Sequence, residues 1–200
     1  MKKKILNALM KNIQKNNSKL NEEQLEIIKY GLESIYLSIT KLTVILTLAI
    51  ILNIFKETIY VIIFYNVIRF CAFGMHANNS ISCLITSTIL FIGGALIGIY
   101  FNFSLITKII VSAICLTLII IYAPADTVKH PLLKASKRKK LKIKSSIISL
   151  ILSLFIVYFH ENNITNFMLI GYIEAAIMIL PVTYKLYGLP YNNYKNYGSI

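Results

Sequence analysis

Long runs of apolar residues recur along this chain and are separated by short polar joints. Runs of about 20 apolar residues match the hydrocarbon width of a bilayer. Because lipid cannot hydrogen-bond a backbone, segments of this kind must be helices or closed barrels of strands. Stretches such as VILTLAIIL lack the alternation that membrane strands need. The pattern therefore predicts an all-α, polytopic membrane protein folded as a helical bundle.

About six transmembrane helices fit the pattern best. The predicted spans are residues 34–55, 59–73, 83–101, 105–122, 146–159 and 167–186. The second and fifth spans have only about 15 residues, fewer than the ~20 that a perpendicular helix needs. We expect these two to be either re-entrant or shielded by other helices.

The segment before the first span, residues 1–33, is polar and has a helical pattern. Leu6, Leu9 and Ile13 recur at helical spacing among lysines, and Asn21 followed by Gln24 resembles a capping box. We expect a basic amphipathic N-terminal helix that lies on an anionic leaflet. Residues 1–30 lack the uninterrupted apolar core of a signal peptide. Residues 34–186 would then form the membrane domain, and residues 187–200 a C-terminal tail.

The charge is strongly basic, with 21 Lys and Arg against 8 Asp and Glu and a net charge of +13. In a membrane protein this balance indicates positive-inside topology and anionic lipid rather than nucleic acid. Residues 1–33 hold seven lysines and residues 129–144 hold eight Lys or Arg, whereas the joints after the first, third and fifth spans hold Lys56, Lys108 and no basic residue. With six spans, both termini and a basic loop at residues 123–144 are predicted to be cytoplasmic.

Polar residues are densest in RFCAFGMHANNSISCLITS, which runs from residue 69 to residue 87 at a membrane edge. His76 and Cys83 are seven residues apart, which is two helical turns and one helix face. An imidazole near a thiol can take its proton and later return it to a leaving amine. Gly74 would let the backbone pass close to a substrate. The alternative is that this His and Cys are structural.

Other polar residues in the apolar runs have both a functional and a structural interpretation. Arg69 either acts at the site or extends its head to the lipid headgroups. Glu174 is the one carboxylate deep in a span, so it is either functional or paired with Lys41 across the bundle. Cys71 and Cys115 have no histidine nearby in sequence and are expected to pack as small apolar residues.

Four residues form the pattern R-x4-G-x-H-x6-C, namely Arg69, Gly74, His76 and Cys83. This pattern resembles the signature of the AgrB (accessory gene regulator B) family. IIKYGLE at residues 27–33 and YAPADT at residues 122–127 agree with it, and the resemblance covers nearly the whole chain. One departure stands out, because the family often has two glycines where this chain has Phe73 and Gly74.

AgrB proteins are membrane cysteine endopeptidases of bacteria that process AgrD-type propeptides into cyclic quorum-sensing peptides. The resemblance implies that Cys83 attacks the propeptide and forms a thioester, with His76 as base and then as acid. A nucleophile of the substrate, typically a thiol, would displace Cys83 and close a ring. Supporting or substrate-binding roles would belong to Arg69, Gly74, Asn78, Asn79 and Ser80.

The partners that we expect are an AgrD-like propeptide and anionic lipids, with a homodimer left open and no nucleic acid, cofactor or metal. The basic loop would attract the acidic tail of the propeptide, or would serve only to set the topology. Two other functions remain open on the residues alone. One is a small transporter or exporter subunit with Arg69 and Glu174 along its path, and the other is a membrane scaffold.

Overall fold

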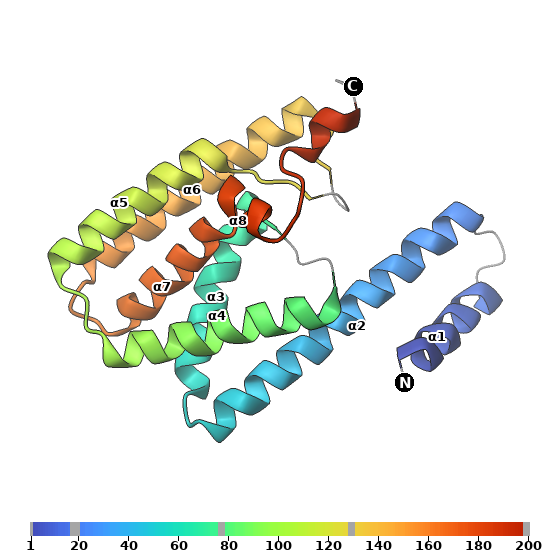
Figure 1. Cartoon of the computed structure of the whole chain (residues 1–200), viewed down its shortest axis with the longest axis horizontal. Coiled ribbons are helices and arrows are strands. Elements are labelled where there is room, and N and C mark those ends of the chain that lie inside the picture. The colour runs from blue at the N-terminus through green and yellow to red at the C-terminus, as the bar shows by residue number, and fades with distance from the viewer. Residues whose placement is uncertain (1, 17–20, 76–78, 128–130, 198–200) are drawn as a thin grey trace. The chain divides into compact units, whose positions relative to one another are not determined.

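The computed structural model describes residues 2–16, 21–75, 79–127 and 131–197, and over these residues the chain is helical (Figure 1). The only β-bridge among the described residues is an isolated one between Phe73 and Ala125. The elements are α1 (Lys2–Asn16), α2 (Glu22–Ile51), α3 (Phe55–Ala72), α4 (Ser80–Tyr100), α5 (Leu105–Tyr122), α6 (Ala135–Tyr158), α7 (Ile164–Ile177), α8 (Pro181–Leu186) and the 3-10 helix η1 (Asn193–Tyr197).

Two compact units make up the chain, residues 1–48 and residues 49–200. In the first unit the predicted capping box is confirmed, because the Asn21 side chain accepts from the Gln24 backbone N–H at 2.8 Å and the Gln24 side chain accepts from the Asn21 N–H at 3.1 Å. The amphipathic segment expected at residues 1–33 is divided between α1 and the start of α2. Helix α2 then continues without a break into the first predicted span.

Among the described residues, four helices are long and apolar enough to cross a membrane: α2 from Gln24 onward, α4, α5 and α6. Helix α3 has 18 residues, and the apolar helix α7 has 14. The polytopic helical bundle expected from the sequence is therefore confirmed. The four long helices together with α3 and α7 correspond to the six predicted spans.

The boundaries of the last two spans differ from the prediction. Helix α6 begins at Ala135 and has 24 residues, so the basic segment 135–144 is helical and the fifth span is not short. Lysine and arginine are good helix formers, which lets the helix extend beyond its apolar part. The span predicted at residues 167–186 is instead broken, because α7 ends at Ile177 and α8 restarts at Pro181. A proline inside a helix removes a hydrogen bond but is tolerated in the first turn.

Helix α7 forms the core of the second unit. It packs against α3, α4, α5 and α6, and 11 of its 14 residues are buried. In Figure 1, α5 and α6 run side by side and α7 lies next to them. A helix of this length spans about 21 Å, less than the ~30 Å of a bilayer core. It is apolar on all sides because its neighbours, rather than lipid, surround it.

Close approach of α7 to its neighbours depends on glycines. A Cβ atom on Gly171 would lie 2.8 Å from the Val61 carbonyl oxygen and 2.9 Å from the Tyr65 backbone nitrogen, both in α3. On α4, Gly94 and Gly98 leave room for the side chains of Glu174 and Phe167 of α7. Small residues four apart commonly let helix backbones meet in membranes.

The connections α4–α5 and α6–α7 lie at one end of this unit, which we call the far end. There Lys108 is buried, and its ammonium donates to the His160 carbonyl at 2.6 Å and to the Thr165 hydroxyl at 2.8 Å. The sequence pattern placed Lys108 in a joint near solvent. It lies instead in the first turn of α5, where it binds the turn between α6 and α7.

Gly171→Ala should destabilise the bundle by about 1–3 kcal/mol, because the new methyl group meets the backbone of α3 and α3 has to shift. The measurement is the loss of folded protein on heating in detergent. Gly93→Ala is the control, since nothing lies within 4 Å of the Cβ position there. It should leave the stability unchanged or raise it slightly. Equal effects of the two substitutions would contradict the close packing of α7 on α3.

Candidate active site

Cys83 lies in the first turn of α4, at the end of the unit opposite the far end. The Asn79 side chain caps this helix by accepting from the Ser82 backbone N–H at 2.6 Å, and the Cys83 N–H bonds to the Asn79 carbonyl at 3.0 Å. Asparagine at this position satisfies one of the N–H groups that every helix start leaves unbonded. Cys83 is a free thiol and is half-buried. The sequence-based expectation that it begins an apolar helix is confirmed.

The short segment after α3, residues 73–75, is bound by backbone hydrogen bonds to two distant parts of the chain. The Gly74 N–H donates to the Ala125 carbonyl at 2.9 Å, and the Ala125 N–H donates to the Ala72 carbonyl at 2.9 Å. The Met75 N–H donates to the Met178 carbonyl at 3.0 Å. The residue that directly precedes His76 in the chain is therefore held in place.

Arg69, in the last turn of α3, binds the segment at residues 73–75 through its side chain. Its guanidinium donates to the carbonyls of Gly74 and Met75, each at 3.0 Å. A planar guanidinium can hold two acceptors in fixed directions, which a lysine ammonium does not do. Arg69 thus binds the turn, rather than extending away from the protein.

Tyr65 is a member of the site that the sequence analysis missed. It is four residues before Arg69, and its hydroxyl accepts a hydrogen bond from the same guanidinium. The ring packs edge-on against Phe91 of α4 at 5.1 Å between centroids. Tyr65 and Arg69 therefore connect the turn to the helix that carries the thiol. Their i, i+4 spacing was the available signal.

Asp126 was also missed, although it belongs to the YAPADT segment. It is buried, and its carboxylate accepts from the backbone N–H groups of Leu132 at 3.3 Å, Asn193 at 2.8 Å and Tyr194 at 2.8 Å. Hydrogen bonds to a charged acceptor are stronger than neutral ones. Asp126 therefore fixes the start of η1 beside the loop that binds Gly74.

Two tyrosines join the same loop to the C-terminal segment. The Tyr184 hydroxyl donates to the carbonyls of Ala125 at 3.2 Å and Asp126 at 2.8 Å. Tyr191 packs edge-on against Tyr184 at 5.1 Å and donates to the Tyr122 carbonyl at 3.3 Å. Burial raises the pKa of Tyr191 to about 12, so this hydroxyl remains a donor at neutral pH. Residues after 187 therefore form part of the structure around the site.

The other predicted residues lie in different surroundings. His76 and Asn78 lie outside the described residues. Ser80, the first residue of α4, is exposed. Cys71 and Cys115 are buried, in keeping with the packing role expected of them. Glu174 is buried in α7, and its Oε2 atom has no hydrogen-bond partner among the described residues.

Backbone conformation accounts for the glycine in the sequence pattern. Gly74 has φ +123°, and a Cβ atom there would lie 2.9 Å from the Met178 carbonyl oxygen. Phe73, at the position where the AgrB family often has a second glycine, also has a positive φ of 59°. Residues with a side chain rarely adopt positive φ values, whereas glycine adopts them readily. The departure from the family pattern therefore falls on a strained residue.

Fold and site together define a polytopic helical membrane protein with a free cysteine thiol at a helix start and an arginine-bound turn at the end of the preceding helix. Comparison with known proteins gives the family. The AgrB family model, described as Accessory gene regulator B, matches residues 3–180. The chain belongs to the AgrB family.

Relatives in several bacteria agree with this assignment. The chain is 37% identical over 174 residues to Accessory gene regulator protein B of Staphylococcus aureus (strain JH9), covering 85% of this chain and 89% of that protein. It is 34% identical over 180 residues to an AgrB-like protein of Clostridium acetobutylicum, covering 89% and 86%. No solved structure matches the chain. Family membership gives the protein a role in agr quorum sensing.

Gly74→Ala should destabilise the turn by about 1–3 kcal/mol, because alanine at this φ is strained and meets the Met178 carbonyl. The measurement combines thermal stability in detergent with the rate at which a small maleimide modifies Cys83, in a background lacking Cys71 and Cys115. Phe73→Gly is the matched change, since it relieves strain while removing a half-buried ring. It should shift stability by no more than about 1 kcal/mol. A harmless Gly74→Ala would contradict the geometry of this turn.

Proposed function

We propose that this protein is a membrane cysteine endopeptidase that removes the C-terminal tail of an AgrD-like propeptide and promotes cyclisation of the remainder into a quorum-sensing peptide. Membership of the AgrB family supports a role in this system. The observation that carries the proposal is the position of Cys83. It is a half-buried, free thiol at the start of α4, the helix that follows in the chain the turn whose backbone is held up to the residue before His76.

In the first step of the proposed reaction, His76 takes the proton of the Cys83 thiol, and the thiolate attacks the carbonyl carbon of the scissile bond. The C–N bond then breaks, and the departing amine takes the proton from His76. A thioester between the signal segment and Cys83 remains. A thiol of the substrate gives its proton to His76, attacks this thioester and closes a thiolactone ring. The released Cys83 thiolate takes the proton back from His76, which restores the starting state.

Negative charge that develops on the attacked carbonyl oxygen needs nearby donors. The N-terminus of α4 supplies the positive end of a helix dipole, and backbone N–H groups of a first turn have no partner within their own helix. The Asn79 side chain already binds the N–H of Ser82. The N–H groups of Ser80 and Ile81 are therefore the proposed oxyanion donors.

Arg69 acts as a positioning residue in this proposal. It binds the carbonyls of Gly74 and Met75 and so fixes the backbone of the two residues directly before His76. Its bond to Tyr65 extends this support toward α4, because Tyr65 packs against Phe91. A catalytic base must be held within hydrogen-bond reach of its proton, and small displacements are costly in rate.

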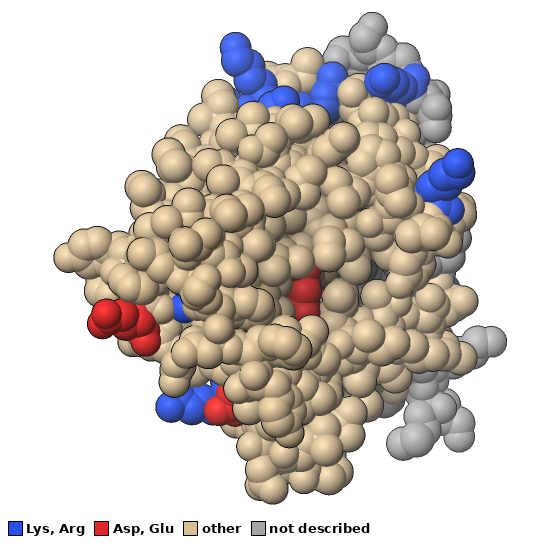
Figure 2. Space-filling view, turned by 60° about the vertical axis from the view of Figure 1, so that its left-hand side comes forward, with Lys and Arg blue, Asp and Glu red and all other residues tan. Residues whose placement is uncertain are grey.

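Basic side chains support a cytoplasmic position for the site and an acidic partner. Figure 2 shows Lys and Arg gathered along the upper edge, the edge at which α6 begins in Figure 1, while the middle is nearly free of basic residues. Exposed lysines here are Lys134, Lys137, Lys139, Lys140, Lys142 and Lys144. Such a surface attracts anionic lipid headgroups and the acidic tail of a propeptide. The positive-inside rule puts it in the cytoplasm.

A transporter or exporter subunit is the second candidate, and Glu174 favours it. This carboxylate is buried in α7, and its Oε2 atom lacks a hydrogen-bond partner among the described residues. Acidic residues within membrane bundles commonly belong to ion or substrate paths. A transporter would depend on Glu174 and tolerate loss of the Cys83 thiol, whereas the peptidase would show the reverse.

The thioester predicts a trapped adduct. When the protein is given an AgrD-type propeptide whose ring-closing cysteine is replaced by alanine, the signal segment should accumulate on Cys83, because no thiol is present to displace it. Intact-mass analysis should show the added mass, and neutral hydroxylamine should release it. Cys83→Ala should give neither adduct nor cleavage, since a methyl group cannot attack a carbonyl.

Two comparisons make this result decisive. His76→Ala should lose nearly all cleavage while inserting normally, and Glu174→Gln should retain cleavage. Normal processing by Cys83→Ala would exclude the peptidase, and loss of activity only in Glu174→Gln would favour the transporter. Linear product without any adduct would replace the thioester by direct hydrolysis.

The orientation can be tested with single cysteines at Ser136 and Asn163, in a chain lacking the native three. Both residues are exposed, and they lie at opposite ends of α6. In intact cells an impermeant maleimide should label the cysteine at position 163, because its joint holds no Lys or Arg and is therefore expected outside. Position 136 should react only after the cells are opened. Labelling of position 136 from outside would move the proposed site to the other face of the membrane.

A further inference from the structure

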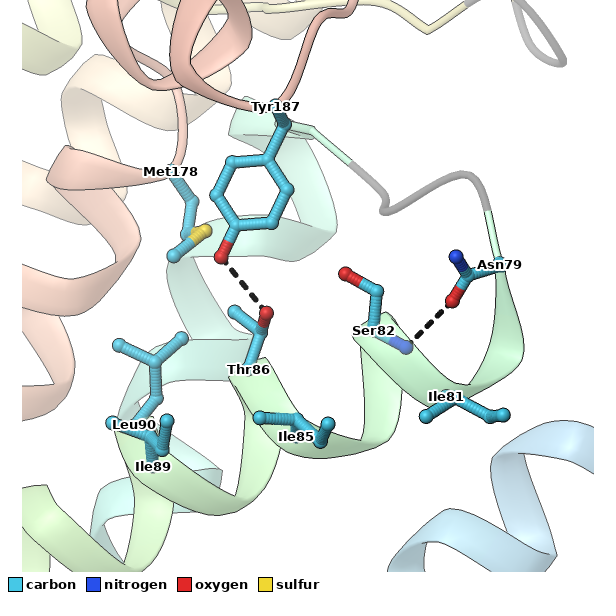
Figure 3. Close-up of a pocket in the computed structure, with 9 residues that line it drawn as sticks. All are labelled: Asn79, Ile81, Ser82, Ile85, Thr86, Ile89, Leu90, Met178 and Tyr187. Carbon is cyan, nitrogen blue, oxygen red and sulfur yellow. Dashed lines mark hydrogen bonds between the residues drawn. The ribbon is translucent and has the colours of Figure 1, made fainter.

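A groove with a volume of about 620 Å³ runs along α4, beginning at Asn79, Ile81 and Ser82, in the turn of the helix that carries Cys83 (Figure 3). Figure 3 shows the side chains of Thr86 and Leu90 on α4, with Met178 and Tyr187 on the other side. Thr86 and Leu90 are three and seven residues after Cys83, so they share its side of the helix. Among the described residues, the lining consists of Asn79, Ile81, Ser82, Ile85, Thr86, Ile89, Leu90, Met178 and Tyr187.

The chemistry of this lining selects apolar ligands. The described part of the lining holds no charged side chain, and isoleucine, leucine and methionine form most of its wall. Asn79 is engaged in capping α4 through its bond to the Ser82 N–H. The groove therefore offers little to an acidic or basic side chain, and it gains from the burial of apolar ones.

One polar feature within the groove distinguishes a peptide from a lipid tail. The hydroxyls of Thr86 and Tyr187 are 2.8 Å apart and share one hydrogen bond. Two hydroxyls carry two hydrogens, and this bond uses one of them, so the pair still has a hydrogen to donate. A peptide carbonyl can accept that hydrogen, whereas a hydrocarbon chain has no acceptor.

The length of the groove matches a short peptide segment. From Asn79 to Leu90, α4 rises about 16 Å at 1.5 Å per residue. An extended peptide advances about 3.3 Å per residue, so this distance holds about five residues. Because the groove begins in the helical turn that carries Cys83, one end of such a segment would lie near the thiol.

The proposed reaction determines which side of the scissile bond needs this groove. The tail leaves as an amine, while the other segment stays bound to Cys83 and must be kept from water until the ring closes. We propose, on the basis of the peptidase function above, that the groove binds about five residues on the N-terminal side of the scissile bond and selects apolar side chains among them. Thr86 and Tyr187 then bind the backbone of this segment.

Filling the groove tests this assignment. Ile85→Trp places a large ring in it, and Ile97→Trp is the matched control on the same helix, outside the groove and also exposed. With an AgrD-type propeptide, Ile85→Trp should raise KM about tenfold or more, as expected when an apolar pocket is blocked. Ile97→Trp should resemble the unaltered protein. Alanines in place of the apolar residues before the scissile bond should weaken cleavage by the unaltered protein more than by Ile85→Trp.

A photoreactive benzoylphenylalanine at Ile89 in the Cys83→Ala protein provides a test that does not depend on turnover. It should crosslink to the propeptide on the N-terminal side of the scissile bond, and the same probe at Ile97 should not. Crosslinking to lipid alone, or equal cleavage by Ile85→Trp and Ile97→Trp, would overturn the groove assignment. In those cases a Cys83-dependent adduct would still support the peptidase, whereas cleavage independent of Cys83 would remove both proposals.

Discussion

Hydrogen bonding of the backbone in the turn after α3 is the constraint on which the site depends. At the end of a membrane bundle, polar backbone groups that are withdrawn from water must find partners within the protein. Arg69 satisfies the carbonyls of Gly74 and Met75, and the carbonyls of Ala125 and Met178 accept their N–H groups. Arg69, the loop at Ala125 and the end of α7 at Met178 therefore all bind Gly74 or Met75. Each of these contacts helps to fix the backbone directly before His76.

Helix α7 transmits the packing of the bundle to that turn. Its glycine contact with α3 and its contacts with Gly94 and Gly98 of α4 fix its position, and the Met178 carbonyl at its end binds Met75. Asp126 and Tyr184 fix the loop after α5 by joining it to the C-terminal segment. The result is a rigid frame made from elements that are far apart in sequence. Enzymes that must hold a reactive intermediate benefit from such preorganisation.

In the proposed function, charge and apolar surface have separate tasks. The exposed lysines near the start of α6 would collect a propeptide and its acidic tail at the membrane surface. The groove along α4 would hold the apolar segment that remains on Cys83. A thioester is higher in energy than the amide that it replaces, so keeping water away decides whether a ring or a linear peptide forms.

Much of this protein was determined by the sequence itself. Apolar runs specify helices because lipid offers the backbone no partners, and the Asn21–Gln24 capping box and the position of Cys83 at a helix start followed from local pattern. Two predictions from the sequence pattern were wrong: a continuous last span, which is broken before Pro181, and a short fifth span, which is the 24-residue helix α6. Apolar composition alone does not show where a helix breaks inside the protein or where it extends beyond its apolar part. The contacts of Tyr184 and Asp126 join residues 58 to 68 positions apart, and Arg69 could equally have extended toward lipid headgroups. Only the tertiary structure decided these features, because a buried hydrogen-bond partner is chosen by the packing that brings distant segments together.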